Sequence, residues 1–237
     1  MLHFLIFVLI LIVDTVINAI FTFTIGIFNP FSILNTAIMK IWAKIILISA
    51  GIKLEVLGKE NIQKNSSYVV IANHQSLMDI PVAITALPTN VRFISKKELF
   101  KIPFWGWIMK SVGILKIDRA DSKQAITTLK KAEKIIQHHH LSILAFPEGT
   151  RSHNGLIHQF KKGPFVLAIN GGLPLLPVSI SGTRNILPKG EIRINSGKVK
   201  VIIHPPLSVD NLSYKDRSLI ANKTKEIIEE GFIEGFG

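Results

Sequence analysis

The stretch Tyr68-Val-Val-Ile-Ala-Asn-His-Gln-Ser-Leu-Met-Asp79 decides the fold class, because an apolar run leads directly into a polar turn. A short run rich in Val and Ile that ends in polar residues is typical of a buried β-strand. Similar runs recur along the chain, and helical patterns separate them. The expected strands are Lys53–Leu57, Tyr68–Ala72, Val91–Ser95, Ile114–Ile117, Ser142–Phe146, Leu175–Ile180 and Val199–His204. This alternation predicts an α/β fold with a mixed, largely parallel sheet flanked by helices.

Two amphipathic segments are expected to be helices of this domain. Ser122–Gln137 carries apolar residues at helical spacing, and Ser213–Glu230 follows the same pattern. Ser213 and Asp216 have the spacing of a capping box, and Gly231 is the expected stop. We find no repeat, low-complexity tract or linker within 51–237, so these residues are expected to form one domain.

The N-terminal region, residues 1–50, is expected to be a membrane element. Residues 2–28 are nearly all apolar, and roughly 20 such residues cross a bilayer core. Asn29-Pro30 ends this segment, and a second apolar segment covers 31–50. Asp14 would cost a few kcal/mol in lipid, so a shallow two-helix hairpin competes with a true span. We favour the hairpin.

Charge is distributed unevenly along the 237 residues, which hold 28 Lys and Arg against 16 Asp and Glu. Asp14, Lys40 and Lys44 are the charged side chains of the first fifty residues, so the following domain is strongly basic. Lysines soon after residue 50 predict, by the positive-inside bias, that this domain lies on the cytoplasmic side. In a bacterium this would be the cytoplasmic face of the inner membrane.

Aromatic and lysine side chains interleave over residues 93–107. This mixture is typical of a headgroup boundary, where rings lie in the interface and ammonium groups contact phosphates. Nucleic-acid surfaces have a similar composition, but the apolar N-terminal region favours an anionic membrane surface as the partner. We therefore expect no nucleic acid. The absence of cysteine excludes disulfides, zinc ribbons and thiolate nucleophiles.

His74 and Asp79 form the first candidate pair. His74 follows a predicted strand, where α/β sheets bind ligands, and Asp79 lies just over one helical turn later. A histidine can take a proton from an alcohol, while a carboxylate on its other nitrogen fixes the tautomer. The alternative is that Ser76 or Asp79 caps the next helix, which Pro81 in the first turn would suit. Local spacing does not separate these interpretations.

The second candidate cluster is Phe146-Pro-Glu-Gly-Thr-Arg-Ser152, at the end of another predicted strand. The planar fork of Arg151 matches phosphate oxygens, and the turn at Gly149 lets backbone N–H groups approach the same anion. The segment therefore resembles a phosphate cradle. The alternative is a solvated loop with a surface arginine. The nearby Lys161 and Lys162 are also compatible with a solvent-exposed surface.

Taken together, four blocks resemble the motifs of the glycerolipid acyltransferases. They are Asn73–Asp79, Gly113–Arg119, Phe146–Ser152 and Leu176–Val178, in the order of that family. The similarity extends to Phe160–Gly163 and Gly182–Arg184 and covers roughly residues 50–210. One block alone would be weak evidence for the family. Four blocks in the family's order favour the catalytic interpretation of His74 and Asp79.

The resemblance implies transfer of a fatty acyl group from acyl-CoA or acyl carrier protein to the sn-2 hydroxyl of lysophosphatidic acid, giving phosphatidic acid. His74 would be the general base and Asp79 would orient it, while Ser76 would not be a nucleophile. No acyl-enzyme, metal or bound cofactor is implied. Residues 51–237 would be the acyltransferase domain, and residues 1–50 the family's two-helix element in one leaflet.

The resemblance also assigns the acceptor site. Arg151 and Arg119 would hold the acceptor's phosphate, with Lys97 as a further candidate, while Glu148, Gly149 and Thr150 would shape the glycerol site. Three alternatives stay open: another lysophospholipid or a lyso-aminolipid as acceptor, a lysophospholipid hydrolase, and a non-catalytic lipid-binding protein. Residues 138–140, three histidines, match no motif and are expected to be a solvated helix end.

Overall fold

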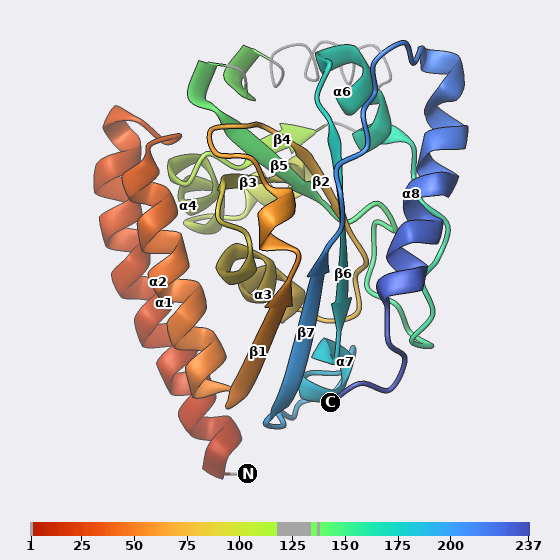
Figure 1. The fold of residues 1–237 in the computed structure, drawn as a ribbon. Helices are drawn as coiled ribbons and strands as arrows, with labels where there is room; N and C mark the ends of the chain where they lie inside the picture. Colours follow the sequence, from red (N-terminus) through yellow and green to blue (C-terminus); the bar gives the residue numbers. More distant parts are fainter. Residues whose placement is uncertain (1, 118–133, 137) are drawn as a thin grey trace.

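The computed structural model describes residues 2–117, 134–136 and 138–237, in which all seven expected strands form one sheet (Figure 1). The strands are β1 (Ile52–Leu57), β2 (Val69–Ala72), β3 (Asn90–Lys96), β4 (Leu115–Ile117), β5 (Leu141–Ala145), β6 (Leu175–Ser181) and β7 (Gly197–Ile203). Their order is β1-β7-β6-β2-β5-β3-β4. The β6–β7 pair is antiparallel and the others are parallel. The predicted mixed, largely parallel sheet is confirmed.

Helices cover both faces of the sheet (Figure 1). They are α1 (Leu2–Phe28), α2 (Ile33–Ser49), α3 (Asp79–Ala86), α4 (Trp105–Ser111), α6 (Gly163–Gly171), α7 (Thr183–Ile186) and α8 (Arg217–Gly231), with 3₁₀ turns η1 (Lys59–Asn61), η2 (Lys97–Lys101) and η3 (Tyr214–Asp216). Strand β2 is buried on both sides because its residues alternate. Val70 packs with α1, α2 and α3, whereas Val69 packs with α6 and α8.

The capping box predicted for the C-terminal helix is present, since Ser213 and Asp216 exchange both of its hydrogen bonds. The predicted stop is wrong by one residue, because Gly231 is still helical and Phe232 is the C-cap. Of the predicted helix Ser122–Gln137, residues 134–136 are helical, and the remainder lies outside the described residues.

The N-terminal region forms an antiparallel helical hairpin, in which α1 and α2 lie side by side (Figure 1). By length and composition α1 could cross a membrane, and most of its apolar side chains are exposed. Asp14 is instead buried and accepts a hydrogen bond from the Asn18 side chain at 2.7 Å. Trp42 of α2 donates its Nε1 hydrogen to Thr15 of α1 at 3.1 Å. The Trp42–Thr15 contact thus joins the two helices, whereas the Asp14–Asn18 contact lies within α1.

Helix α2 also belongs to the core of the α/β domain. Ile46, Leu47 and Ala50 are buried in the cluster that contains Val70 of β2 and Val82 of α3. Helix α1 contributes Phe7 to the same cluster. The predicted membrane element and the predicted domain therefore share one hydrophobic core, and removal of residues 1–50 would expose it.

A buried arginine fixes the turn of the hairpin to the sheet. Arg92 of β3 is fully buried and donates hydrogen bonds to the carbonyl oxygens of Pro30 and Ser32, both at 3.1 Å. It also donates to the Thr36 hydroxyl of α2 at 2.7 Å. Burial lowers the pKa of Arg92 to about 10, so the guanidinium stays charged at neutral pH. Nearby, His139 packs on Phe31 of the turn, while the flanking His138 and His140 are exposed.

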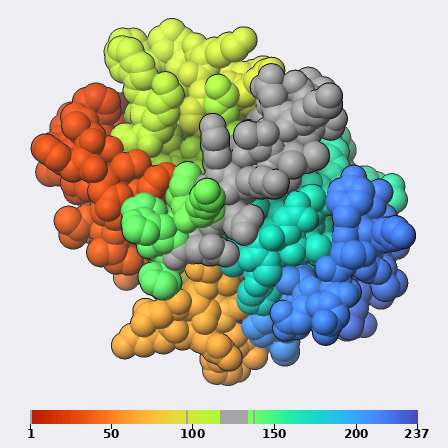
Figure 2. Space-filling model, turned by 90° about the horizontal axis from the view of Figure 1, so that it is seen from above, coloured from red at the N-terminus to blue at the C-terminus, as the bar shows by residue number. Residues whose placement is uncertain are grey.

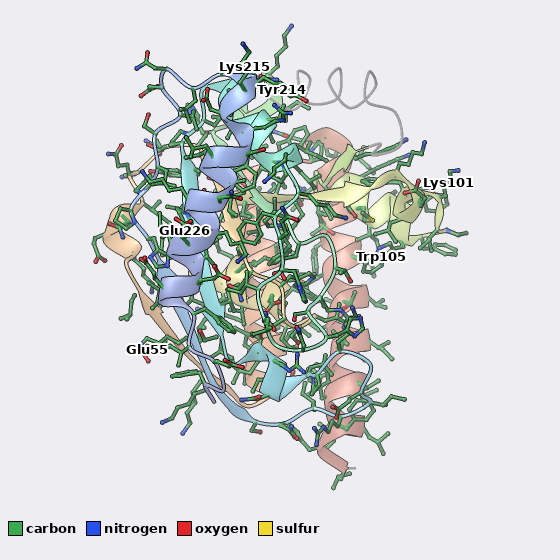
Figure 3. All side chains as sticks on the ribbon, turned by 90° about the vertical axis from the view of Figure 1, so that its right-hand side faces the viewer. Glu55, Lys101, Trp105, Tyr214, Lys215 and Glu226 are labelled. Atoms are coloured by element: carbon green, nitrogen blue, oxygen red, sulfur yellow. The ribbon has the colours of Figure 1, made fainter. Side chains whose placement is uncertain are left out.

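Viewed from the end of the molecule that holds this turn, the hairpin lies beside the segment that carries η2 and α4 (Figure 2). Exposed apolar side chains continue from α1 onto this segment, where Phe104, Trp105 and Trp107 are exposed. Figure 3 shows Lys101 and Trp105 on one side of the body, away from α8. The interleaved aromatic and lysine residues of the sequence therefore lie next to the hairpin.

Candidate active site

Three neighbouring strands bring the candidate residues to one edge of the sheet. Strand β2 lies between β5 and β6 and is parallel to both, so all three end at the same edge. The chain leaving β2 carries His74, the chain leaving β5 carries the segment 146–152, and the chain leaving β6 carries Thr183. Segments far apart in the sequence therefore meet at this edge.

His74 and Asp79 form a hydrogen-bonded pair. The His74 Nδ1 and Asp79 Oδ2 atoms are 2.8 Å apart, and the Asp79 side chain is fully buried while His74 is 15% exposed. An ionised carboxylate only accepts hydrogen bonds, so Nδ1 carries the hydrogen and Nε2 is left with its lone pair. This arrangement suits a general base whose tautomer is fixed.

Asp79 does not cap helix α3. It is the first helical residue, and its Oδ2 atom accepts the backbone N–H groups of Gln75 at 2.6 Å and Ser76 at 2.8 Å, which precede the helix. The Ser76 hydroxyl donates to the Leu187 carbonyl at 2.7 Å and is fully buried. That hydroxyl is therefore poorly placed to act as a nucleophile.

The segment 146–152 forms hydrogen bonds with the backbone of His74. The Glu148 Oε1 atom accepts the His74 N–H group at 2.7 Å, and the Ser152 N–H group donates to the His74 carbonyl at 2.8 Å. The Phe146 ring stacks on the His74 ring with centroids 4.2 Å apart. These contacts hold the imidazole between the two strand exits.

Glu148 is buried and contacts two loops of the site. Its second oxygen, Oε2, accepts the His158 N–H group at 3.0 Å, so both oxygens bind backbone. Burial raises the pKa of Glu148, and the hydrogen bonds from the His158 and His74 amides oppose this rise. Its predicted role in shaping the glycerol site would therefore be exerted through the backbone of these loops.

Gly149 makes the turn of this segment possible. Its φ angle is +75°, which favours glycine, and a Cβ atom there would lie 2.8 Å from the Lys161 Nζ atom. The Lys161 ammonium group therefore lies directly over the turn, which favours the cradle over a plain solvated loop. Thr150 is exposed and Arg151 is half-buried, as an acceptor-binding role requires.

The structure places two further cations, Lys189 and Arg184, beside the segment 146–152. The Lys189 Nζ atom contacts the Arg151 carbonyl at 2.7 Å, the Thr150 hydroxyl at 3.1 Å and His153 Nε2 at 2.5 Å. Arg184 donates to the His153 carbonyl at 2.7 Å. The resemblance includes Arg184 in a matching segment, whereas nothing around Lys189 distinguishes it from a surface lysine.

A basic cluster therefore surrounds the loop at 149–153, and we define it as Arg151, Lys161, Arg184 and Lys189. Within the described residues none of these four forms a salt bridge with a carboxylate. Four positive charges without such compensation favour an anion at this edge.

Of the two remaining candidates, Lys97 is less closely placed. Lys97 begins η2 directly after β3, which is separated from β2 by β5. Arg119 lies outside the described residues. Within the described ranges, no group of three or more histidine and acidic side chains is arranged to hold a metal ion.

The chain is similar to known acyltransferases. A family model described as Acyltransferase matches residues 53–181. The chain is 38% identical over 172 residues to the chloroplastic 1-acyl-sn-glycerol-3-phosphate acyltransferase BAT2 of Brassica napus, covering 72% of the chain and 49% of that protein. It is 30% identical over 191 residues to the human 1-acyl-sn-glycerol-3-phosphate acyltransferase alpha, covering 81% of the chain and 68% of that protein.

The fold is also similar to a crystal structure. The 1-acyl-sn-glycerophosphate (LPA) acyltransferase PlsC of Thermotoga maritima superposes with a TM-score of 0.77 and 30% identity, covering 97% of the chain and 93% of that protein. By contrast, the chain spans about half the length of the Brassica relative and of its Arabidopsis thaliana counterpart.

Proposed function

We propose, from the premise that the chain belongs to the acyltransferase family, that it acylates the sn-2 hydroxyl of 1-acyl-sn-glycerol-3-phosphate. The product would be phosphatidic acid, an intermediate of phospholipid biosynthesis, and the donor a thioester of CoA or acyl carrier protein. The observation that carries this proposal is the His74–Asp79 pair, held at 2.8 Å beside a basic cluster. The names of the relatives support the choice of acceptor.

The geometry supports a sequential reaction. The Nε2 atom of His74 takes the proton of the hydroxyl as its oxygen attacks the thioester carbonyl, and Asp79 stabilises the resulting imidazolium. Collapse of the tetrahedral intermediate breaks the C–S bond, and the proton on Nε2 passes to the departing thiolate. The products are an ester and a free thiol, and His74 returns to its starting state. No step needs an acyl-enzyme, a metal or a bound cofactor.

The direct test is an acceptor and donor panel, measured by mass spectrometry on the membrane fraction. Lysophosphatidic acid with acyl-CoA or acyl carrier protein thioester is expected to give phosphatidic acid. Other lysophospholipids and a lyso-aminolipid serve as competing acceptors, and preferred acylation of one of them would replace the proposed acceptor. Fatty acid released without a donor would identify a hydrolase, and lipid binding without turnover would identify a binding protein.

Arg151→Lys tests recognition of the phosphate. We propose that Arg151, together with Arg119 and Lys97, binds the acceptor's phosphate. Lysine keeps the charge but loses the two-point fork, so turnover of lysophosphatidic acid is expected to fall. If the fork also positions the hydroxyl against His74, kcat falls on the order of 10²-fold, because a misplacement of about 1 Å has that effect. Steady-state kinetics with lysophosphatidic acid and a neutral monoacylglycerol measure the change.

Arg217→Lys is the matched control, because Arg217 begins α8, where its guanidinium lies over the Tyr214 ring and donates to the Tyr214 carbonyl. It should leave both acceptors unaffected. Equal losses for both acceptors in Arg151→Lys would make Arg151 a structural residue, and the phosphate contact would then be sought at Arg119 or Lys97.

The proposed location is the cytoplasmic face of a membrane, in a bacterium the inner membrane. The exposed face of α1 would enter one leaflet, with the lysines and aromatic rings of the neighbouring η2–α4 segment at the headgroups. The net charge of +12 would add attraction to anionic lipids.

Membrane association is tested on the surface of α1, because deletion of the hairpin would open the core. Leu9, Val16 and Ile20 are 63%, 55% and 62% exposed. Replacement of all three by Asp should move the protein from the membrane fraction to the soluble fraction, because each charge is costly in lipid. Flotation with vesicles that contain phosphatidylglycerol, at low and high salt, measures this change.

Leu219→Asp is the control, since Leu219 is 69% exposed on α8, which covers the sheet face opposite α1 and α2. It should float like the wild type. A triple variant that still floats after a high-salt wash would place the main anchor elsewhere, with the aromatic residues of α4 as the next candidates.

A further inference from the structure

Thr183 makes a contact with the candidate catalytic pair that neither the sequence motifs nor the relatives' names assign. Its Oγ1 atom donates a hydrogen bond to Asp79 Oδ1 at 2.5 Å, and both side chains are fully buried. The two residues are 104 positions apart in the sequence. We infer that Thr183 is a positioning residue of the reaction, acting on His74 through Asp79, an inference that rests on the proposed function.

The fold brings Thr183 to this place through β6. This strand is parallel to β2, with Val178 beside Ala72, and it continues to Ser181 at the site edge. Gly182 then reverses the chain with a φ angle of +97°, and a Cβ atom there would lie 2.4 Å from the Lys198 carbonyl oxygen. The turn therefore places the following hydroxyl at Asp79.

The contacts of Asp79 divide between its two oxygens. Oδ2 accepts His74 Nδ1 and the two amides at Gln75 and Ser76, whereas Oδ1 accepts Thr183. With both oxygens held, the carboxylate cannot rotate, so Oδ2 stays aligned with the imidazole. Removal of the hydroxyl would leave a buried carboxylate oxygen without this donor and would loosen the plane of the carboxylate.

The Thr183 hydroxyl also affects how strongly the Asp79 carboxylate attracts a proton. A hydrogen bond to a carboxylate favours its ionised form and makes it a weaker base. Without Thr183 the carboxylate attracts the proton on His74 more strongly, so the pKa of His74 should rise. Glu148 is a second carboxylate whose charge interacts with His74, and its two oxygens accept backbone N–H groups and not the Thr183 hydroxyl. The shift should therefore depend on the Asp79 contact.

The experiment compares Thr183→Val, which keeps the shape but removes the donor, with Thr183→Ser, which keeps the hydroxyl. For Val we expect kcat to fall about 10- to 100-fold, with KM for both substrates within about twofold. Ser should restore most of the activity. Thr224→Val is the matched control, because Thr224 is equally buried but donates to the Ile220 carbonyl within α8. Thermal unfolding of each variant verifies the fold.

A second measurement does not need turnover. The full-length protein in micelles, labelled at histidine Cε1, gives the titration of His74 by NMR, with its signal assigned through its loss in His74→Ala. Thr183→Val should raise the His74 midpoint by several tenths of a pH unit, whereas Thr183→Ser and Thr224→Val should not.

The outcomes separate this inference from the proposed function. A wild type that makes no phosphatidic acid refutes the proposed reaction, while the titration still decides the role of Thr183. An unchanged titration in Thr183→Val, or kcat within twofold of an active wild type, overturns the inference. A Ser variant as impaired as the Val variant also overturns it, because packing and not the hydroxyl would then matter.

Discussion

His74→Ala is expected to lower acyl transfer about 10²- to 10⁴-fold, because it removes the base that takes the proton of the acceptor hydroxyl. Because its side chain is 15% exposed and stacks on the Phe146 ring, the variant also loses some packing, so its stability is measured beside its activity. The backbone contacts to Glu148 and Ser152 do not involve the imidazole and should persist. Phosphatidic acid formation, vesicle flotation and thermal unfolding together measure the effect.

His138→Ala controls for the loss of an imidazole at an exposed position on the other end of the sheet. It should match the wild type in every measurement. A His74→Ala variant that folds and retains near-full activity would falsify general-base catalysis by this residue, and the non-catalytic lipid-binding alternative would then be favoured.

Asp79→Asn is expected to lower turnover on the order of 10³- to 10⁴-fold, by analogy with the loss of the aspartate in a Ser–His–Asp triad. An NH₂ group cannot occupy the Oδ2 position, where three N–H donors converge. The amide nitrogen must therefore lie at the Oδ1 position, where the Thr183 hydroxyl would have to accept instead of donate. The imidazolium then faces a neutral oxygen and loses its counter-charge.

The same change in a capping box should be mild, because the side-chain oxygen of asparagine can still accept the backbone N–H group of Ser213. Asp216→Asn in the capping box before α8 is the matched control, and its activity should be unchanged. An Asp79→Asn variant with wild-type kcat would restore the interpretation of Asp79 as a local structural residue.

The strands were predictable because their signals are local. Val and Ile runs bounded by polar turns marked every strand, and the four motif blocks indicated His74, Asp79 and the segment 146–152 as site residues. Parallel pairing of β2 and β5 then brings these two segments together without further information.

The remaining features depend on contacts between distant residues. Thr183 and Lys189 act across 104 and 38 positions respectively, and nothing in their own neighbourhood indicates those partners. The backbone contacts of Glu148 likewise arise only when two loops meet. Apolar composition predicted that α2 enters the membrane, but it could not show that one side of this helix completes the domain core, because both environments select apolar side chains.

The basic cluster has a consequence for the end of the catalytic cycle. Acyl transfer changes the sn-2 oxygen but leaves the phosphate untouched, so any group that binds the phosphate of the acceptor binds that of the product equally well. Such uniform binding cannot accelerate the chemical step and favours product inhibition. In the proposed reaction, release of phosphatidic acid would therefore be favoured by its second acyl chain, because each CH₂ group moved from water into a bilayer contributes about 0.8 kcal/mol. The bilayer would thus remove the product from the site and allow the next turnover.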